Sequence, residues 1–328
     1  MLNGLKRNGA FLLDRVADLR TQGHAHYPRA PERWRFYLDF ATTFPFCGQS
    51  VADYFQYEFA RKPLAERRPF VTALRVERVL RAFNDPRALH VFRDKAEFSR
   101  TFGDLMGREL FDPALETADA LARFLESHPS IVVKPVEGLM GLGVRFLAAD
   151  ERADPTALHP WLRQRHAILE EAIVQHPALA ELHPASVNTV RIVTVLRGSA
   201  VHLAESFMRM GCGGRCVDNR HGGGIAAPVD ADTGRVTDVA IGMEGTRHAR
   251  HPTTNAAIVG FIVPHWPEVL ALVRTAATRV PAVRYVGWDI AVTSEGRPIL
   301  VEGNNRAGFD SQAVDQVGKW ELYRSLMK

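Results

Sequence analysis

The chain of 328 residues is 46% hydrophobic and has a formal net charge of +4. This length and composition exclude a short peptide or a disordered tail and leave room for two or three subdomains, each with its own core. Residues 1–100 hold 18 Lys or Arg against 11 Asp or Glu, whereas residues 101–328 hold 23 against 26. The basic excess therefore belongs to the N-terminal third, where it indicates solvated arginine faces or attraction to an acidic partner or membrane surface.

Cysteine usage and hydrophobic runs give expectations about the compartment. Cys47, Cys212 and Cys216 are an odd and sparse set, which fits a reducing compartment better than a disulfide framework. The segment GCGGRC lacks the further ligands that a zinc site needs. Asp14 and Arg15 interrupt the first apolar run, and no window of 18 uninterrupted apolar residues occurs. We therefore expect a cytoplasmic protein without a signal peptide or a membrane span.

The first third of the chain is predicted to be helical. Apolar residues recur at intervals of three and four over residues 51–83, with arginines between them, which is typical of amphipathic helices with basic outer faces. Asp85 followed by Pro86, and Asp112 followed by Pro113, are patterns of helix N-termini.

Strands are predicted beyond residue 130. The β-branched run IVV at residues 131–133 and the glycines after it indicate a strand, a loop and a second strand. The segments TVRIVTVL and VHLAESFMRM are predicted to form adjacent strands, and WPEVLALVRTAATRVP a helix with Pro267 in its first turn. The last strands, in GWDIAVTSEGRPILVEGNN, form a predicted hairpin, so the fold class is α+β.

This hairpin places two acids among apolar residues. A turn centred on SEGR makes the numbers of paired residues sum to 591, so Ile290 would face Val301 and Asp289 would face Glu302. Two carboxylates directly opposite each other are destabilising unless something positive lies between them. Asn304 lies on the same face as Glu302 and adds a neutral oxygen. The three residues suit Mg²⁺, which binds through one or two carboxylates together with substrate phosphates and water.

A solvated face is the alternative interpretation of these acids. The flanking residues Trp288, Ala291 and Leu300 are apolar, which a solvated face would not need. The sequence leaves the metal site and the solvated face as comparable alternatives for the hairpin taken alone.

Basic residues and a glycine loop upstream suit a phosphate ligand. Lys134 ends the strand IVVK, and Gly138, Gly141 and Gly143 follow it, which would let backbone amides approach an anion closely. An ordinary glycine-rich turn is the alternative, since the segment is not a P-loop and is not followed by a helix. Lys95, in FRDKAEF, is a further phosphate candidate or a surface lysine.

The order of these features resembles that of the ATP-grasp superfamily. Two lysines, a glycine loop, the segment LEEAIVQHP, two strand arginines and the acidic hairpin follow one another along the chain. The interval of 13 residues between the two acids and the intact Glu-x-Asn set are the specific part. Much of residues 90–318 is similar to the sugar-transfer-associated subgroup, in the segments HPASVNTVRIVTVL, MRMG, VDNRHGGGIAAPVDADTGRV, HPTTNAAIVGFIVPHWPEV and GWDIAVTSEGRPILVEGNN.

The resemblance implies an ATP-grasp fold, in which two α+β lobes clasp ATP, and ATP and Mg²⁺ as cofactors. It implies a basic helical region over residues 1–90, an N-terminal lobe with the glycine-rich loop over residues 91–172, and a C-terminal lobe with the Mg²⁺-binding hairpin over residues 173–328.

The resemblance also implies roles for individual residues at the nucleotide. Lys95 and Lys134 would bind phosphates, while the carbonyl of Glu171 and the amide of Ile173 would bind adenine. The implied metal ligands are Asp289, Glu302 and Asn304.

Further residues are implied near the reacting groups. Arg191 would neutralise phosphates, Arg209 would lie near the transferred γ-phosphoryl group, and Asn219, beside glycines 222–224, is similar to a loop position near the acceptor. Two departures from the family pattern concern the substrate. Residues 1–90 lack the parallel α/β domain of many ATP-grasp ligases, and Arg306 stands in NNRAG where better known relatives have a proline, either as a contact for a substrate carboxylate or as a surface residue.

The expected activity is an ATP-dependent, ADP-forming carboxylate-amine (or thiol) ligase that acts through an acyl phosphate, because a free carboxylate is a poor acyl donor. Its substrates would be a small-molecule carboxylate and an amine, peptide or sugar-linked partner. A phosphotransferase on the same scaffold and a non-catalytic nucleotide-binding protein are alternatives. Nucleic acid is disfavoured as a partner because the basic third has no interleaved aromatic platform. His221 is the histidine candidate for a general base.

Overall fold

From residue 17, where the described part of the chain begins, the elements before the first strand are helices, and that strand begins at Leu110. The computed structural model describes residues 17–136, 143–215, 217–242 and 245–328. The chain divides into two compact units, one formed by Met1–Ala82 with Asp315–Lys328 and the other by Phe83–Val314. No helix in the described part of the chain combines the length and apolar character that crossing a bilayer requires.

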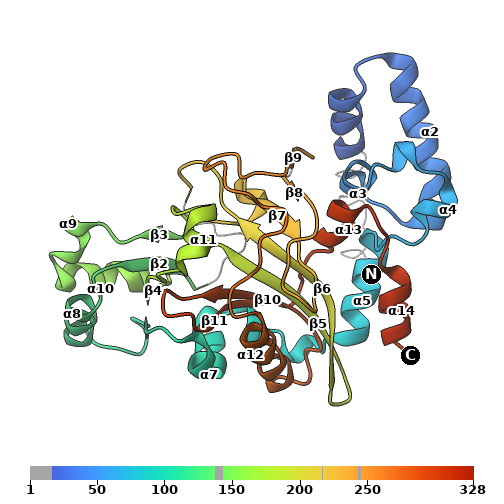
Figure 1. Ribbon diagram of the computed structural model, residues 1–328. Coiled ribbons are helices and arrows are strands. Elements are labelled where there is room, and N and C mark those ends of the chain that lie inside the picture. The colour runs from blue at the N-terminus through green and yellow to red at the C-terminus, as the bar shows by residue number, and fades with distance from the viewer. Residues whose placement is uncertain (1–16, 137–142, 216, 243–244) are drawn as a thin grey trace, which may run out of the picture. The chain divides into compact units, whose positions relative to one another are not determined.

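The first unit is helical, as predicted, but its elements are shorter than the periodic run 51–83 suggested. They are α2 (Ala30–Cys47), α3 (Val51–Gln56), the 3₁₀ turn η1 (Phe59–Arg61), α4 (Leu64–Arg67), α5 (Ala73–Phe83, whose last residue belongs to the second unit) and α14 (Trp320–Leu326) (Figure 1). Ser50 begins α3 with a capping box, in which it exchanges hydrogen bonds with Asp53. Pro63 then precedes α4. Caps and prolines thus divide a run that apolar spacing alone would join.

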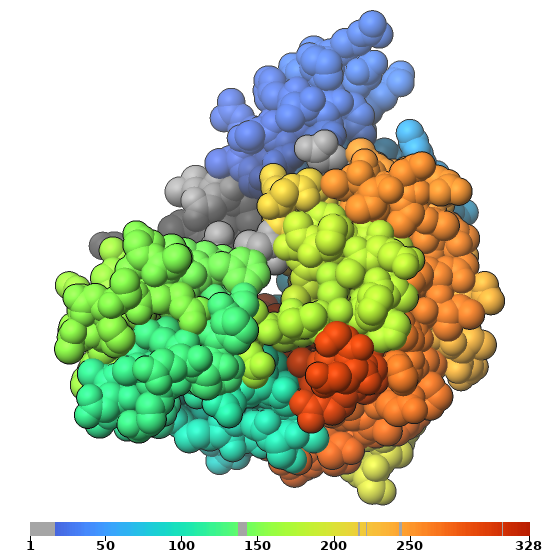
Figure 2. All heavy atoms as spheres, turned by 60° about the vertical axis from the view of Figure 1, so that its left-hand side comes forward, coloured from blue at the N-terminus to red at the C-terminus, as the bar shows by residue number. Residues whose placement is uncertain are grey.

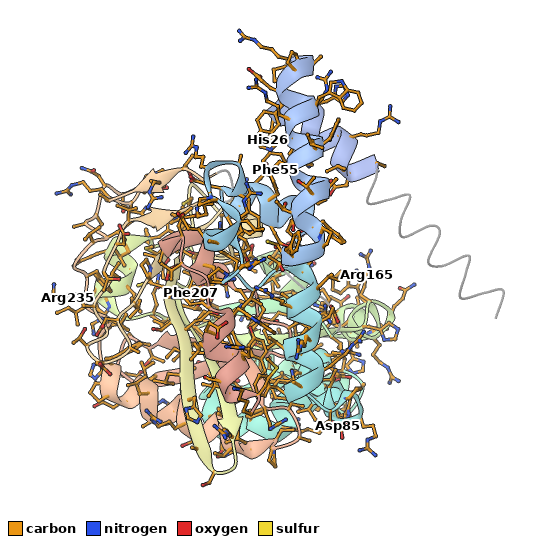
Figure 3. The ribbon with its side chains drawn as sticks, turned by 90° about the vertical axis from the view of Figure 1, so that its right-hand side faces the viewer. His26, Phe55, Asp85, Arg165, Phe207 and Arg235 are labelled. Carbon is orange, nitrogen blue, oxygen red and sulfur yellow. The ribbon has the colours of Figure 1, made fainter. Side chains whose placement is uncertain are left out.

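Aromatic side chains form the core of this unit. Phe36 and Phe59 are buried, and His26 stacks on Phe55 with a centroid distance of 3.9 Å (Figure 3). Arg67, predicted on a basic outer face, instead points inward: its side chain is 7% exposed and pairs with Asp39 at 2.8 Å. The N-terminal basic excess is therefore not all solvated.

The C-terminal segment of this unit packs so closely against Pro69 and Phe70 that Gly318 has no room for a side chain. A Cβ on Gly318 would overlap backbone atoms of Pro69 and Phe70. We expect Gly318→Ala to lower the free energy of unfolding by about 1–3 kcal/mol, because the backbone must shift to accept the methyl group. Urea unfolding of the full chain measures this change.

Gly103 is the matched control, because a Cβ there has no atom within 4 Å and the residue lies inside a helix. Gly103→Ala should raise the free energy of unfolding by about 0.5–1 kcal/mol. A Gly318→Ala protein as stable as the wild type would contradict the packing described.

The second unit contains a small four-stranded antiparallel sheet. Its strands are β1 (Leu110–Phe111), β2 (Ile131–Pro135), β3 (Arg145–Phe146) and β4 (Ala167–Glu171), in the order β1-β4-β2-β3. Helices α8 (Ala118–Ser127) and α10 (Pro155–Gln164) bury Leu121 and Leu162 against it, and α9 (Ala149–Arg152) precedes α10.

The helix predicted to start at Asp112 begins later. Thr117 is the N-cap of α8, and its side chain accepts a hydrogen bond from the amide of Ala120. Asp112 instead stabilises a turn by accepting from the amide of Ala114 at 2.9 Å. An Asp-Pro pair serves turns as well as helix starts, so the sequence pattern placed this boundary wrongly.

A seven-stranded antiparallel sheet carries the charged residues of the second unit. Its order is β11-β10-β5-β6-β7-β8-β9, with the bounds β5 (Thr189–Arg197), β6 (Ala200–Met210), β7 (Ile225–Pro228), β8 (Ala240–Ile241), β9 (Arg247–His248), β10 (Tyr285–Val292) and β11 (Pro298–Asn304). The strands predicted at 131–133, in TVRIVTVL, in VHLAESFMRM and in the final hairpin are thereby confirmed.

Helices cover one face of this large sheet. α7 (Lys95–Met106) and α12 (Trp266–Arg279) contact each other there and bury Met208, Trp288 and Leu300 (Figure 1). The other helices and turns described in the second unit are η2 (Pro86–Ala88), α6 (His90–Arg93), α11 (Pro177–Leu182), η3 (Arg220–Gly222) and α13 (Asp310–Asp315, whose last residue belongs to the first unit). Because side chains alternate along a strand, the residues between those of the buried face point to the other side, toward the small sheet.

Candidate active site

A recess lies within the second unit, lined by residues of both sheets. Figure 2 shows a hollow where the green part of the chain faces the yellow-green part. The apolar lining includes Phe92, Phe98, Met106, Val132 and Phe146. The polar lining comprises Arg93, Lys95, Arg108, Lys134, Arg145, Glu170, Glu171, Thr189, Arg209, Asp218, Asn219, Asp289, Glu302 and Asn304.

The predicted pairing of Asp289 with Glu302 across the hairpin is confirmed, but the inner register is wrong. Ile290 pairs with Leu300, not with Val301, and the register shifts by one residue between Asp289 and Ile290. The turn is centred on Glu295, half a residue earlier than predicted: the amide of Thr293 bonds to the carbonyl of Arg297 at 2.9 Å, so the pairs nearest the turn sum to 590. A β-bulge at Val301 then restores the sum of 591 at Asp289.

Asp289 is buried, and two arginines from neighbouring strands neutralise it. Arg191 donates to both carboxylate oxygens, with Nη2 to Oδ2 at 2.6 Å, and Arg209 donates through Nη1 to Oδ2 at 2.7 Å. Burial alone would raise the pKa of Asp289, but the two guanidinium groups outweigh it and hold the pKa well below the usual range. The positive charge that opposing carboxylates require thus comes from the neighbouring strands.

Glu302 differs from Asp289 because its side chain remains 49% exposed. Its carboxylate accepts from Asn304 Nδ2 at 2.8 Å and lies 3.8 Å from Arg191. Partial desolvation and the like charge of Asp289 raise the pKa of Glu302. The three residues predicted as metal ligands therefore lie together at the recess, with Glu302 accessible from it.

The donor set fits Mg²⁺ shared with a phosphate ligand. Its atoms are hard carboxylate and amide oxygens, which Mg²⁺ prefers. In the described ranges no three His, Cys, Asp or Glu side chains form a cluster that could hold a metal by themselves. One or two carboxylates completed by phosphate oxygens and water is the usual arrangement for Mg²⁺ in nucleotide sites.

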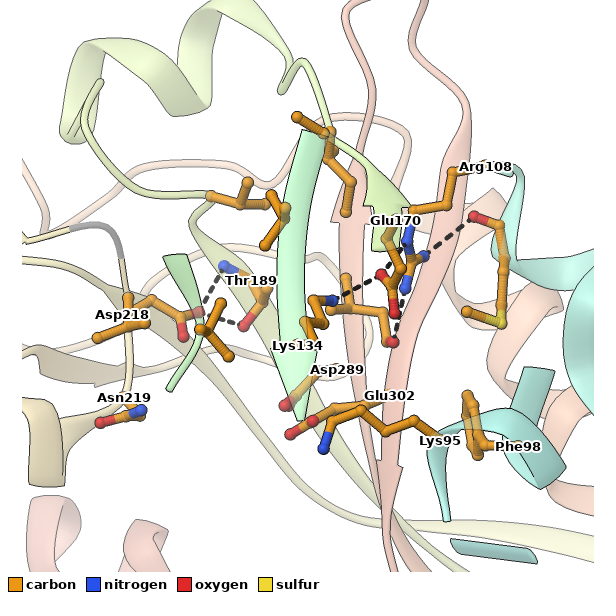
Figure 4. A pocket seen from close by; sticks show the side chains of 18 of the residues that line it. Lys95, Phe98, Arg108, Lys134, Glu170, Thr189, Asp218, Asn219, Asp289 and Glu302 are labelled. Carbon is orange, nitrogen blue, oxygen red and sulfur yellow. Dashed lines mark hydrogen bonds and ion pairs between the residues drawn. The ribbon is translucent and has the colours of Figure 1, made fainter. Parts of the chain in front are cut away.

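Arg209 also binds a second carboxylate, which the sequence interpretation missed. Its Nη2 lies 3.0 Å from Asp218 Oδ1, and Asp218 accepts from the backbone amide and the hydroxyl of Thr189 (Figure 4). Burial alone would lower the pKa of Arg209, but Asp218 and Asp289 raise it above its ordinary value. Arg209 is therefore a permanent cation fixed between two anions.

Both predicted phosphate lysines line the recess. Lys134 on β2 donates to Glu170 at 2.6 Å, and Lys95 at the start of α7 lies 3.4 Å from the carbonyl of Val136. Burial and the neighbouring charge of Lys134 lower the pKa of Lys95, against the opposing effect of Glu302. In Figure 4 the amino group of Lys95 lies next to the carboxylate of Glu302.

Glu170 on β4 pairs with both Lys134 and the buried Arg108. Neither Glu170 nor Arg108 was predicted at the site from the sequence. Arg108 Nε donates to Glu170 at 2.7 Å, and the two side chains are 2% and 4% exposed. Burial alone would raise the pKa of Glu170, but Arg108 and Lys134 outweigh it and lower the pKa to about 2.

This shift predicts a pH dependence of stability. A carboxylate with a depressed pKa stabilises the fold fully above its unfolded pKa, which is near 4.5, and loses that contribution as the pH falls to about 2. The difference in free energy of unfolding between the wild type and Glu170→Gln should therefore shrink by about 3 kcal/mol from pH 6 to pH 2. Urea unfolding at several pH values measures it, and a difference that does not change with pH would contradict the pairing.

The glycine loop is described only in part. Gly138 and Gly141 lie outside the described residues. Gly143 has a φ of +77°, and a Cβ there would lie 2.8 Å from the ring of Pro135. Both the left-handed backbone and the close packing therefore require glycine at this position.

The other predicted residues differ in their positions. Glu171 and Ile173 line the recess, where β4 ends. Asn219 lines it too and is the N-cap of η3, accepting from the amide of Gly222. Arg306 is exposed just after β11 and is not among the described residues that line the recess. His221 lies within η3.

Comparison with known families adds to this geometry. The model of the sugar-transfer associated ATP-grasp family matches residues 162–325, half of the chain. The chain belongs to this family. The matched range contains Arg191, Arg209, Asp289 and Glu302, whereas Lys95 and Lys134 lie before it. The predicted family and the predicted α+β ATP-grasp fold, preceded by helices, are confirmed.

Solved structures similar to this ATP-grasp protein include three ligases. The ATP-grasp ligase PsnB complexed with minimal precursor is 18% identical, with a TM-score of 0.46, over 75% of this chain and 64% of that one. D-alanyl-alanine synthetase A from Vibrio cholerae O1 biovar eltor str. N16961 is 13% identical, with a TM-score of 0.43, over 70% and 60%. L-amino acid ligase from Bacillus licheniformis is 14% identical, with a TM-score of 0.41, over 73% and 48%. The chain thus spans less than two thirds of each of them. A comparison with curated proteins finds no match.

Proposed function

We propose that this ATP-grasp protein is an ATP-dependent, ADP-forming ligase that joins a carboxylate to an amine or a thiol. The observation that carries the proposal is the convergence, in one recess, of the charged side chains that an ATP-grasp reaction needs. They are Lys95, Lys134, Arg209, Asp289 and Glu302, with the neutral Asn304 bonded to Glu302 and Arg191 paired with Asp289.

The apolar and charged parts of the recess suit different parts of ATP. Met106, Val132 and Phe98 offer apolar surface for an adenine ring, and Glu171 and Ile173, whose backbone would bind adenine, also line the recess. Lys95, Lys134 and Arg209 would bind the phosphates. Asp289, Glu302 and Asn304 would hold Mg²⁺, which when bound supplies charge neutralisation at the phosphate oxygens.

In the proposed reaction the substrate carboxylate oxygen attacks the γ-phosphorus of ATP. The bond from that phosphorus to the bridging oxygen breaks, ADP leaves, and an acyl phosphate forms. The amine then attacks the acyl carbon, the C–O bond to phosphate breaks, and the amine loses a proton as phosphate leaves. Phosphoryl transfer needs positioned cations more than a protein nucleophile. Arg209 suits this task because two carboxylates hold it in one orientation.

The test is to incubate the protein with ATP, Mg²⁺ and a metabolite extract and to follow ADP. New compounds whose formation tracks ADP release are then weighed by mass spectrometry. Loss of water between an acid and an amine or thiol supports the ligase. Gain of a phosphate group on one compound would mark a phosphotransferase instead. Binding of ATP without any ADP formation across extracts that contain diverse acids and amines would contradict an enzymatic role.

A further inference from the structure

The bulge at Val301 decides which face of β11 carries the proposed metal ligands. On the turn side of the bulge, Leu300 pairs with Ile290, and both side chains belong to the core under α7 and α12. Beyond it, Glu302 pairs with Asp289 on the opposite, recess face. Val301 is the extra residue and lines the recess as well. Two consecutive residues thus contribute to one face, which regular alternation forbids.

Without the bulge, the pairing of β10 with β11 set at the turn, in which residue numbers sum to 590, would continue along both strands. Glu302 would then pair with Trp288, whose side chain lies in the core, and Asn304 would move to the same face. A slip of one residue moves every later side chain of a strand to the other face of the sheet. The bulge is therefore required for Glu302 to face Asp289.

Arg108 contacts the bulge directly. Its Nη1 donates to the carbonyl of Leu300 at 2.8 Å, and its Nη2 donates to the carbonyl of Val301 at 3.0 Å. Its Nε is bound to Glu170, the carboxylate that also holds Lys134. The planar guanidinium offers donors in a fixed fork, so it can satisfy all three acceptors at once. One buried side chain thus connects the bulge on the large sheet with a phosphate lysine on the small sheet.

We propose that Arg108 is a positioning residue: it fixes the bulge at Val301 and so keeps Glu302 and Asn304 on the recess face. The consequence for metal binding rests on the proposed function, whereas the effect on the register does not. Arg108 acts on the metal site through these residues.

Arg108→Lys is the informative substitution, because an ammonium group keeps the charge near Glu170 but cannot serve the three acceptors in their fixed geometry. Mn²⁺ binding to the full chain is measured by electron paramagnetic resonance with a non-hydrolysable ATP analogue present. We expect the Mn²⁺ affinity to fall about 10- to 100-fold, while analogue affinity without metal changes less than about threefold. A uniform fall of both affinities would indicate a general structural role and overturn the proposal.

Arg297→Lys is the matched control. Arg297 is exposed on the same hairpin and donates to the carbonyl of Gly107 at 2.9 Å, next to Arg108 in sequence, but it does not contact the bulge. We expect this variant to bind Mn²⁺ as the wild type does. An equal loss in both variants would count against a specific role for Arg108.

The strand register supplies a readout that does not depend on metal or nucleotide. Cross-strand contacts between the backbone protons of Asp289 and Glu302 are measured by NMR in the wild type, Arg108→Lys and Arg108→Gln. We expect these contacts to weaken or disappear in both variants. Their full retention in both would overturn the inference. If the wild type showed them but bound no Mn²⁺ with the analogue, the proposed function would fail while the register result would still decide the role of Arg108.

Discussion

Replacing Asp289 with asparagine is expected to lower the free energy of unfolding by about 3–5 kcal/mol, because removing one partner of a buried ion pair leaves the other charge uncompensated. The side chain of Asp289 is 3% exposed, and its partners Arg191 and Arg209 are each 10% exposed. Arg209 would retain Asp218, so Arg191 would lose the most. Urea unfolding of the variant and the wild type, monitored by circular dichroism, measures the change.

Asp104→Asn is the control for this prediction. Asp104 also pairs with an arginine, Arg279, but its side chain is 62% exposed. Exposed ion pairs contribute about 0–1 kcal/mol, so the control should be nearly as stable as the wild type. Equal effects of the two substitutions would show that the Asp289 network does not have the buried character described.

Glu302→Gln is expected to have the opposite profile, with little loss of stability and a large loss of activity. The side chain of Glu302 is half-exposed, and the substitution removes a like charge opposite Asp289, so the free energy of unfolding should change by less than about 1 kcal/mol. If Glu302 holds the metal, the rate of ADP formation should fall about 100-fold or more, because charge stabilisation at the phosphates would be lost. Thermal unfolding and an ADP-release assay measure the two effects.

Glu295→Gln serves as the control on the same hairpin. Glu295 lies exposed in the turn, away from the strand positions that line the recess. It should match the wild type in both measurements. A Glu302→Gln protein that formed ADP at the wild-type rate would remove the hairpin from the proposed chemistry.

The sequence predicted the hairpin pairing at the site for a reason that was only half correct. The predicted turn was centred half a residue too late, and the bulge at Val301 compensated for this by one residue. The bulge has no signal in the alternation of apolar and polar residues, because the carbonyls of Leu300 and Val301 are bound by Arg108, which lies far away in the chain. The pairing of Asp289 with Glu302 was therefore predictable from the sequence, whereas the register shift between the turn and this pair was not.

The residues of the site that were not predicted also depend on contacts between distant parts of the chain. Asp218, in the loop before η3, is bound to Arg209 of β6, and Glu170 of β4 is bound to Lys134 of β2; a single sequence does not display such pairs. The signals that were available lay next to predicted residues: Asp218 precedes Asn219, and Glu170 precedes Glu171. Glu170 also lies in a largely apolar segment, AILEEAIV, which is the pattern that had singled out Asp289.

The position of Asp289 between two guanidinium groups also determines which anions the recess will accept. A phosphate or sulfate ion that arrives alone would have to draw Arg191 and Arg209 away from a carboxylate that already neutralises them. A polyanion accompanied by a divalent cation offers an exchange instead: the cation takes the carboxylate, and the anion takes the arginines. The recess should therefore bind a free anion more weakly than a polyanion bound to a divalent cation. This preference comes from charge alone and does not require contacts with a base or an acyl group.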